Sequence, residues 1–361
     1  MNETTFTDRQ TDRQTDRQTD RQTDRQTDRQ TDRQTDRQEY LIADVMKLLA
    51  AIAVVAIHVQ PISLDGRKGL YSYLLTLAVP FFFSFSGYMI AERNSDIRKV
   101  LNKNIRLYIL WSIIYSPVAI GHYLYLNNSL KITILKIVRG YFLLGEQFYS
   151  WQLWYLLSIV YGLLTIRLLG LLKRSPIFLL ILSISIFSMG YLISYFSEMS
   201  IGLFGRIVSE SIGSGRIFTG LSYLLLGYVT QCFHKNKIFR KVAIIFIFVS
   251  FISAIIGLVK YSTTSWAAYM AIPCLLLIST EIKGKNSYLV CARMVSSTIY
   301  FTHMIFFFLF SCDLTHFIVL ENYHPIKAFF LTLICSIAAG LIYFPYKNMM
   351  HAKIIDRKSS Y

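Results

Sequence analysis

Three ionisable side chains share one face of the first apolar segment, DVMKLLAAIAVVAIH (44–58). On an α-helix, Asp44, Lys47 and His58 fall within about 60° of one another. The rise from Lys47 to His58 is roughly 16 Å, about half the thickness of the hydrocarbon layer of a bilayer. Ionisable groups inside a membrane helix are costly unless they face a cavity or a partner. The pattern therefore predicts a functional site; the alternative is a Lys that snorkels at one end and a His at the opposite interface.

The composition of the 361-residue chain is typical of a polytopic α-helical membrane protein. Apolar residues make up 54% and charged residues only 16%, below the usual quarter in a soluble domain. The apolar residues form long runs between short polar loops. The net charge of +16 does not indicate nucleic-acid binding, because Lys and Arg occupy the loops between apolar runs. Five Cys without paired spacing predict neither a disulfide framework nor a metal site.

The apolar runs predict about ten transmembrane helices and no cleavable signal peptide. If the N-terminus is cytoplasmic, the cytoplasmic loops carry 19 Lys and Arg outside the N-terminal tail, and the opposite loops carry 9. This bias predicts that both termini are cytoplasmic, with Lys47 toward the cytoplasm and His58 near the outer face. The predicted spans are 41–60, 70–91, 106–126, 152–170, 177–197, 217–233, 242–260, 265–280, 294–312 and 326–346.

The N-terminal tail is a repeat with no apolar surface to build a core. Residues 7–38 are eight copies of Thr-Asp-Arg-Gln, so residues 1–39 are predicted to be disordered. The transmembrane domain then covers 40–346, and 347–361 form a basic cytoplasmic tail. The repeat can be encoded by the codons ACA GAC AGA CAG, which are one four-base unit read three times, and a tract of that kind slips during replication. We hypothesise that the tract is a genetic on/off switch; sequencing the locus in sister isolates tests this, and a constant repeat number or scrambled synonymous codons would contradict it.

Four motifs, in order between residues 40 and 346, resemble the acyltransferase-3 family of integral membrane acyltransferases. The family's first helix has an Asp, a basic residue three positions later, and a His after ten more residues, which Asp44, Lys47 and His58 match. The other three are VPFFFSFSGYMI (79–90) with Ser86, Gly87 and Tyr88, WQLWYLL (151–157), and SSTIYFTHMIF (296–306) with Tyr300 and His303. The basic stretch before the third span lacks the Pro that the family usually has there, so the local backbone is expected to differ.

The resemblance implies transfer of an acetyl group from cytoplasmic acetyl-CoA to a hydroxyl of a glycan outside the cytoplasmic membrane, without a metal. His58 would remove the hydroxyl proton as the oxygen attacks the thioester. Lys47 would attract the phosphates or polarise the donor as a point charge, and Asp44 would pair with Lys47 at i,i+3. A narrow passage between the helices would let the pantetheine arm reach His58 while the nucleotide stays inside.

The basic stretch 93–106 is the predicted dock for the phosphates of CoA, with Arg98, Lys103 and Arg106 as its candidate residues. Ordinary positive-inside charge explains the same stretch equally well. The sequence contains no Gly-rich phosphate loop, nucleophile elbow or paired-carboxylate motif.

The remaining candidate site residues each have a structural alternative. His303 either takes part in catalysis or holds a hydrogen-bonded packing role. Ser86 and Tyr88 either line the site or belong to small-residue helix packing. Trp154, like Trp151, is a candidate for the acceptor site, although an anchor at the membrane interface is the favoured interpretation.

Taken together, the sequence predicts an all-α, multi-pass protein of the bacterial cytoplasmic (inner) membrane that O-acetylates a surface glycan. Lipopolysaccharide or lipooligosaccharide is favoured over peptidoglycan, because intermittent modification changes what a host sees. The expected partners are acetyl-CoA, the glycan acceptor and the lipid bilayer. A transporter or flippase for a glycan or lipid-linked substrate is the competing class, because intramembrane ionisable residues also occur in such proteins. Against it, the sequence shows neither the paired half-helices nor the two-fold internal symmetry expected of a transporter. A membrane sensor is a third class, but the tail offers a partner no apolar anchor.

Overall fold

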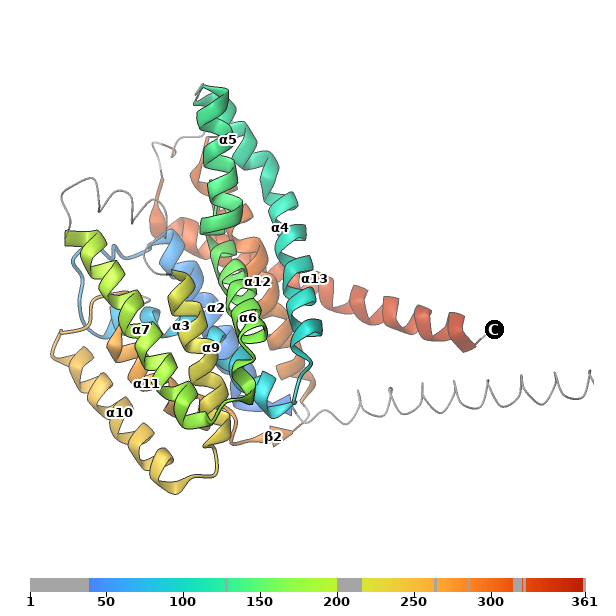
Figure 1. The fold of residues 1–361 in the computed structure, drawn as a ribbon. Helices are drawn as coiled ribbons and strands as arrows, with labels where there is room; N and C mark the ends of the chain where they lie inside the picture. Colours follow the sequence, from blue (N-terminus) through green and yellow to red (C-terminus); the bar gives the residue numbers. More distant parts are fainter. Residues whose placement is uncertain are drawn as a thin grey trace, which may run out of the picture.

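The computed structural model consists of α-helices and one pair of two-residue strands, β1 (Glu39–Tyr40) and β2 (Lys283–Gly284) (Figure 1). The structure describes residues 39–126, 129–199, 216–262, 265–284, 286–313, 320 and 323–359. The predicted disorder of the repeat tail falls outside these residues. The longer helices are α2 (Leu41–Val59), α3 (Leu70–Glu92), α4 (Ile97–Tyr125), α6 (Trp154–Leu168), α7 (Pro176–Met199), α9 (Arg216–Cys232), α10 (Lys237–Ile255), α11 (Trp266–Ser279), α12 (Ser287–Ser311) and α13 (Pro325–Ser359).

Each of the ten predicted spans overlaps one of these helices. Within the described part of the chain, eight helical segments are long and apolar enough to cross a membrane. The other two are α9, with 17 residues, and α11, with 14 residues. The chain is therefore an all-α polytopic membrane protein.

Several helix boundaries differ from the prediction; α10 and α12, for example, begin at Lys237 and Ser287, before the predicted 242 and 294. The third span was predicted to begin at residue 106, but α4 begins at Ile97 because the Asp96 carboxylate accepts the backbone N–H of Arg98 at 2.9 Å and caps the helix. A short helix, α5 (Leu130–Arg139), follows α4 and was not predicted. Helix α13 continues through the predicted basic tail to Ser359.

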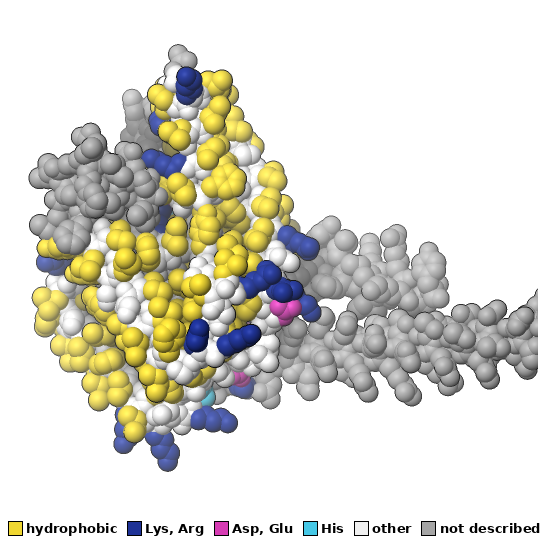
Figure 2. All heavy atoms as spheres, viewed as in Figure 1, with side chains coloured by type: hydrophobic (Ala, Val, Ile, Leu, Met, Phe, Trp, Pro, Cys, Tyr) yellow, Lys and Arg dark blue, Asp and Glu magenta, His cyan; other side chains and the backbone are white. Residues whose placement is uncertain are grey.

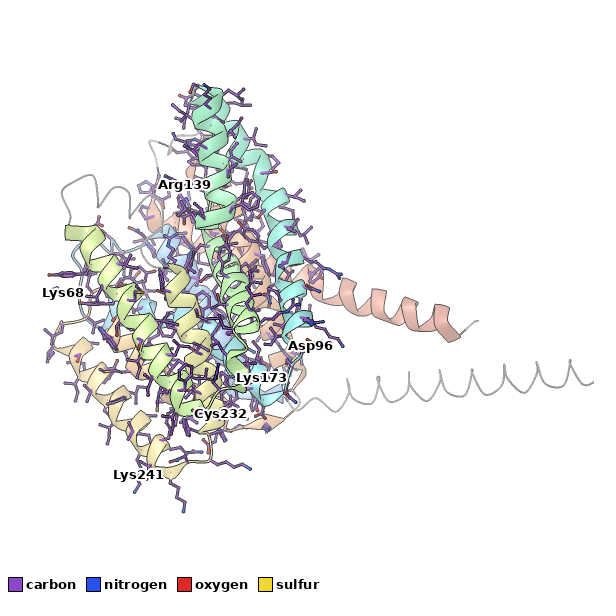
Figure 3. All side chains as sticks on the ribbon, viewed as in Figure 1. Lys68, Asp96, Arg139, Lys173, Cys232 and Lys241 are labelled. Atoms are coloured by element: carbon purple, nitrogen blue, oxygen red, sulfur yellow. The ribbon has the colours of Figure 1, made fainter. Side chains whose placement is uncertain are left out.

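The surface of the bundle is that of a membrane protein. Leu, Ile, Val and Phe side chains are exposed along α4, α7 and α10, which in a soluble protein would be buried. Figure 2 shows apolar side chains over most of the visible face, with most of the Lys and Arg side chains in its lower half and a few near the top. In Figure 3, Lys68 and Arg139 lie toward one end of the bundle, and Lys173 and Lys241 toward the other. This grouping agrees with the two sides assigned from the loop charges.

The core of the bundle is a close crossing of α3 and α9, with α7, α6 and α11 packed around it. Gly87 of α3 faces the backbone of Leu224, and Gly227 of α9 faces the backbone of Ser84. A Cβ atom at either glycine would overlap those backbone atoms. Small residues at a membrane crossing let two helices approach closely and gain van der Waals contact. Gly87 of the second motif therefore lets two helices pack closely.

Replacing Gly227 by Ala is expected to destabilise the protein, because α3 and α9 must separate to admit the new methyl group against a rigid backbone. Overpacking of this kind costs about 1–3 kcal/mol, more than the roughly 1 kcal/mol that Ala gains over Gly in a helix. The measurement is the melting temperature of the detergent-purified protein. Gly340→Ala is the control, since its nearest neighbours lie 3.2–3.4 Å from the added Cβ atom. Equal melting temperatures for the two variants would contradict the prediction.

The strand pair closes the structure at the point where the repeat tail ends. Glu39 pairs with Gly284 and Tyr40 pairs with Lys283 in an antiparallel ladder. The Tyr40 hydroxyl donates a hydrogen bond to the Glu92 carboxylate at 2.7 Å. The residues directly before α2 are therefore attached both to the segment before α12 and to the end of α3.

Candidate functional site

A buried carboxylate organises the N-terminal end of α2. Asp44 is 2% exposed, and its Oδ1 atom accepts a hydrogen bond from Lys47 Nζ at 3.0 Å, as the i,i+3 spacing predicts. Its Oδ2 atom lies 3.3 Å from Nε of Arg293, which belongs to α12. Lys47 Nζ also lies 4.1 Å from the centre of the Phe85 ring. One carboxylate thus holds two cations at the junction of α2, α3 and α12, leaving the cluster with a net positive charge.

His58 lies at the other end of α2, next to two residues from distant parts of the chain. The centres of the His58 and His303 rings are 5.4 Å apart and the rings are stacked at 30°. The centre of the Trp151 ring lies 6.1 Å from that of His58. The first and last of the four motifs, together with the Trp-bearing motif, therefore meet at one place. Lys47 is not part of this group, because the helical rise separates it from His58 by roughly 16 Å.

The hydrogen bonding of His303 defines its tautomer. The residue is fully buried, and Nδ1 lies 2.8 Å from the carbonyl oxygen of Ile299, one turn earlier in α12. Because a carbonyl only accepts, Nδ1 carries the proton and donates it, which leaves Nε2 with a lone pair. Nε2 has no hydrogen-bond partner among the described residues. A buried acceptor without a partner costs about 1–3 kcal/mol, so an imidazole here is not explained by packing alone.

His58, at the C-terminal end of α2, lines a cavity of about 680 Å³. Helix α2 contributes Val54, Ile57 and His58, and α3 contributes Val79. The rest of the wall is polar and aromatic, and comprises Trp151, Trp154, Glu146, Arg216, Asp65, Lys260, Tyr261 and Ser262, together with Gln60, Leu64, Gly66 and Ser194. A cavity of this size and mixed character fits a sugar ring and its substituents.

Trp154 was interpreted as an anchor in the membrane interface, and this interpretation is wrong. Its side chain is 8% exposed and lines the cavity beside the guanidinium of Arg216, whose Cζ atom lies 5.2 Å from the centre of the ring. Arg216 also forms an ion pair with Glu146. The pair holds the start of α9 against the loop that precedes α6, so the wall of the cavity is a fixed arrangement of charges.

The loop that carries Glu146 and Trp151 is itself held by buried polar contacts. Tyr149 has a left-handed backbone conformation, with φ of 54°, which is uncommon for a bulky residue. Its hydroxyl and that of Ser311 are 2.8 Å apart, and its ring stacks on Trp151 at 5.2 Å. Strained residues of this kind persist where surrounding contacts hold them and cluster at functional sites. Tyr149 therefore positions Trp151 against His58.

Aromatic residues separate the His58 cavity from the Lys47 cluster. Along α3, Phe82 lies between Val79, which lines the cavity, and Phe85, which contacts Lys47. Its ring centre is 6.3 Å from that of Tyr155, which in turn is 5.5 Å from Tyr300. Ser86 adjoins this level, and its hydroxyl donates to the carbonyl of Phe82 at 2.9 Å. Any route along α3 from the Lys47 cluster to His58 passes this layer of aromatic side chains.

Tyr88, the third residue of the Ser-Gly-Tyr motif, lies near the C-terminal end of α3 and away from His58. It lines a second cavity, of about 440 Å³, together with Tyr40, Glu92, His234 and Lys283. Its hydroxyl lies 3.1 Å from Nδ1 of His234. Burial lowers the pKa of His234, and the cations of Arg240 and Lys283 lower it further. His234 is therefore neutral at pH 7 and can accept the hydrogen bond of Tyr88.

The three basic residues predicted to dock CoA do not form one cluster. Lys103 and Arg106 line an open groove of about 460 Å³ on α4 with Lys99 and Leu107. Arg98 is exposed at the first turn of α4 and does not line this groove. Nothing in the described contacts joins the groove to Asp44 or to His58.

Sequence reasoning missed Arg293, Glu146, Arg216 and Lys260. Arg293 was counted only as a positive-inside charge, and no spacing links it to Asp44. Glu146 and Arg216 are isolated charges at the ends of apolar runs. A search for charges placed directly before predicted spans would have found Arg293 and Arg216, but not their partners.

Replacing His303 by Phe is expected to lower activity while leaving stability unchanged or improved. Phe preserves a ring that stacks on His58 and removes the buried nitrogen that lacks a partner. We expect the rate of acyl transfer to fall by about tenfold or more, as for the loss of a polar group from an active site. The rate is measured with membranes of matched protein content, and the melting temperature with purified protein. Full activity would assign His303 to packing.

The fold and the site define a class: a polytopic α-helical membrane protein with a histidine-lined cavity that opens to one side. The chain matches the family described as an acyltransferase domain over residues 40–344, and it belongs to this family, the acyltransferase-3 family. It is also 30% identical over 142 residues to a protein of Enterococcus faecalis described as an amino-acid racemase, covering 35% of this chain and 19% of that protein. The chain thus spans about a fifth of the length of this relative. No solved structure matches the chain.

Proposed function

We propose that the protein is an O-acetyltransferase that moves the acetyl group of cytoplasmic acetyl-CoA to a hydroxyl of an extracytoplasmic surface glycan. The observation that carries this proposal is the packing of His303 and Trp151 against His58, which together with Trp151 lines a cavity at the end of α2 opposite the basic Lys47 cluster. This arrangement offers a base where an acceptor can enter and cations where a phosphate-bearing donor can enter. Lipopolysaccharide or lipooligosaccharide is the proposed acceptor.

On the acceptor side, His58 acts as the general base. It takes the proton of the sugar hydroxyl while the oxygen attacks the thioester carbonyl, and the new ester forms as the carbon–sulfur bond breaks. CoA leaves as the thiolate and ends as the thiol after protonation. His303 positions the His58 ring by stacking. Trp151 forms a neighbouring wall.

On the donor side, Lys47 and Arg293 are better placed to bind the phosphates of CoA than Arg98, Lys103 and Arg106. They form one cluster around Asp44, with net positive charge, at the cytoplasmic end of α2. The cavity at His58 reaches inward to Val54, which leaves a helical rise of roughly 10 Å to Lys47. The pantetheine arm spans such a distance if the layer around Phe82 opens. The basic groove on α4 attracts the donor to the membrane surface.

The topology that fits this chemistry has ten crossings and both termini in the cytoplasm, with the protein in the bacterial inner membrane. Helices α9 and α11 are then the two short crossings, and both lie inside the bundle, where α9 packs against α3, α6, α7 and α11. A helix buried among others needs no full-length apolar surface, because its neighbours cover its ends. Expression is switched on and off by slippage within the repeat tract.

The test is transfer of radioactive acetyl from acetyl-CoA in inverted membrane vesicles, followed by extraction of the surface glycan. Label is expected in the glycan as a base-labile ester, with release of one free CoA thiol per acetyl group. Vesicles from cells without the gene are the control. Thioester cleavage without label in any glycan would contradict the proposed acceptor. Accumulation of a glycan across the membrane without cleavage would favour a transporter.

A further inference from the structure

The cavity at His58 continues into a second, aromatic compartment. This compartment has a volume of about 400 Å³ and shares Ser194, Lys260, Tyr261 and Ser262 with the first cavity. Its own walls include Tyr191, Tyr195 and Trp266. The two compartments therefore form one groove, with Lys260 at the junction.

The aromatic rings of the second compartment form a platform on α7 and α11. Tyr191 and Tyr195 lie one turn apart on α7, with ring centres 6.4 Å apart and ring planes 17° apart. Trp266 lies 6.4 Å from Tyr191. Tyr191 is 38% exposed and Tyr195 47% exposed, so part of each ring is accessible. The C–H face of a pyranose ring is apolar, whereas its edge bears hydroxyls, so rings of this kind stack on aromatic side chains that also offer hydroxyl groups.

Lys260 is fixed in place and has excess positive charge beside it. The segment around it is held by the backbone N–H of Gly69, which donates to the carbonyl of Val259 at 3.0 Å. Lys68 lies directly opposite Lys260 in an antiparallel bridge, an arrangement of like charges that is normally unfavourable. Among the described residues, no ion pair involves Lys260.

The charges around this junction do not cancel. Arg216 and Glu146 neutralise each other within the first cavity. Three of the remaining charges on this rim are positive and exposed: Arg67, Lys68 and Lys260. Apart from Glu146, Asp65 is the single carboxylate among residues 65–68 and the described residues of the cavity wall. Like charges are held together here by backbone hydrogen bonds, so an anion that binds between them removes a repulsion and gains a charge-assisted hydrogen bond.

We infer that the acceptor is an acidic glycan of at least two sugar units, in which the reacting sugar lies at His58 and its neighbour stacks on Tyr191, Tyr195 and Trp266. A carboxylate or phosphate group near the linkage between the two units binds Lys260. This inference rests on the proposed function, since it names the substrate class of the same site.

The experiment measures acetyl transfer from acetyl-CoA to polysaccharide extracted from cells that lack the gene, separated by anion exchange into neutral and acidic fractions. We expect incorporation into the acidic fraction well above that into the neutral fraction. Incorporation into the neutral fraction equal to or above that into the acidic one would overturn the inference while leaving the acetyltransferase in place. No incorporation into either fraction by the unmodified protein would instead be a failure of the proposed function.

Two variants test the residues. Lys260→Gln is expected to raise the acceptor concentration for half-maximal rate by about tenfold, the loss of one charge-assisted interaction, and to weaken its dependence on salt. Tyr191→Leu, which keeps an apolar side chain, is expected to raise it by about fivefold. The KM for acetyl-CoA should not change in either.

Lys241→Gln and Tyr288→Leu are the matched controls, because both are exposed at the opposite end of the bundle. Unchanged acceptor dependence in both test variants would overturn the inference and would assign the aromatic residues to the membrane interface.

Discussion

Replacing His58 by Ala is expected to abolish acetylation of the glycan in a protein that still folds. A positioned general base contributes about 10²–10⁴-fold to the rate, so the loss should exceed about 100-fold. His58 is partly exposed to the cavity, and no other element depends on it for a hydrogen bond among the described contacts. The side chain can therefore be removed without leaving a buried polar group unpaired.

The measurement is mass spectrometry of the surface glycan from cells that express the two forms at matched membrane levels. Loss of one acetyl mass per repeating unit is the expected difference. His324→Ala is the control, since His324 is exposed just before α13 and lines no described cavity. A fully acetylated glycan in the His58 variant would exclude His58 as the base. If the glycan is fully acetylated in the His303→Phe variant but loses its acetyl group in the His58→Ala variant, the chemistry requires only the imidazole of His58.

Replacing Asp44 by Asn is expected to reduce the amount of folded protein more than any other single change of charge. The substitution leaves Lys47 and Arg293 together at the same site without the carboxylate that both contact. Removing one partner of a buried ion pair costs about 3–5 kcal/mol, a large part of the stability of a typical domain. The change in membrane level and in the melting temperature measures this effect.

Glu281→Gln is the matched control for Asp44. Glu281 pairs with Arg240 at 3.1 Å, but both side chains are exposed, and such pairs contribute about 0–1 kcal/mol. A triple variant separates stability from activity: Asp44→Asn with Lys47→Met and Arg293→Met removes all three charges. It should regain stability and remain inactive if the cations bind the donor. Activity in the triple variant would show that the cluster serves only the fold.

The part of the site that lies on one helix could be predicted from the sequence. Asp44, Lys47 and His58 share a face because the helix geometry alone fixes their spacing, and the Asp44–Lys47 contact follows from i,i+3 adjacency. Helix positions could also be predicted, because hydrophobic runs of membrane length have few alternatives. The early start of α4 was missed because its first turns are basic and were assigned to a loop.

The contacts between helices could not be predicted, because they depend on how the helices pack. His303 stacks on His58 across 245 positions of chain, and Arg293 reaches Asp44 across 249, with no sequence pattern that pairs them. The role of Gly87 became clear only from the backbone of α9 opposite it. The burial of Trp154 could not be seen either, since a Trp at the end of an apolar run has the same sequence signature inside a bundle and at a lipid interface.

The strand pair at Glu39–Tyr40 has a consequence for how a population of cells could vary. If the repeat tract slips by three four-base units, the reading frame is kept and the tail gains or loses one Thr-Asp-Arg-Gln. The β-ladder to Lys283–Gly284 and the hydrogen bond from Tyr40 to Glu92 begin immediately after the last repeat. They fix the start of α2, so a gain or loss of one repeat does not change the position of this helix. In-frame variants should then have the same specific activity. Individual cells would then differ in whether they contain the protein and not in its specific activity. The modification would be a binary trait rather than a graded one.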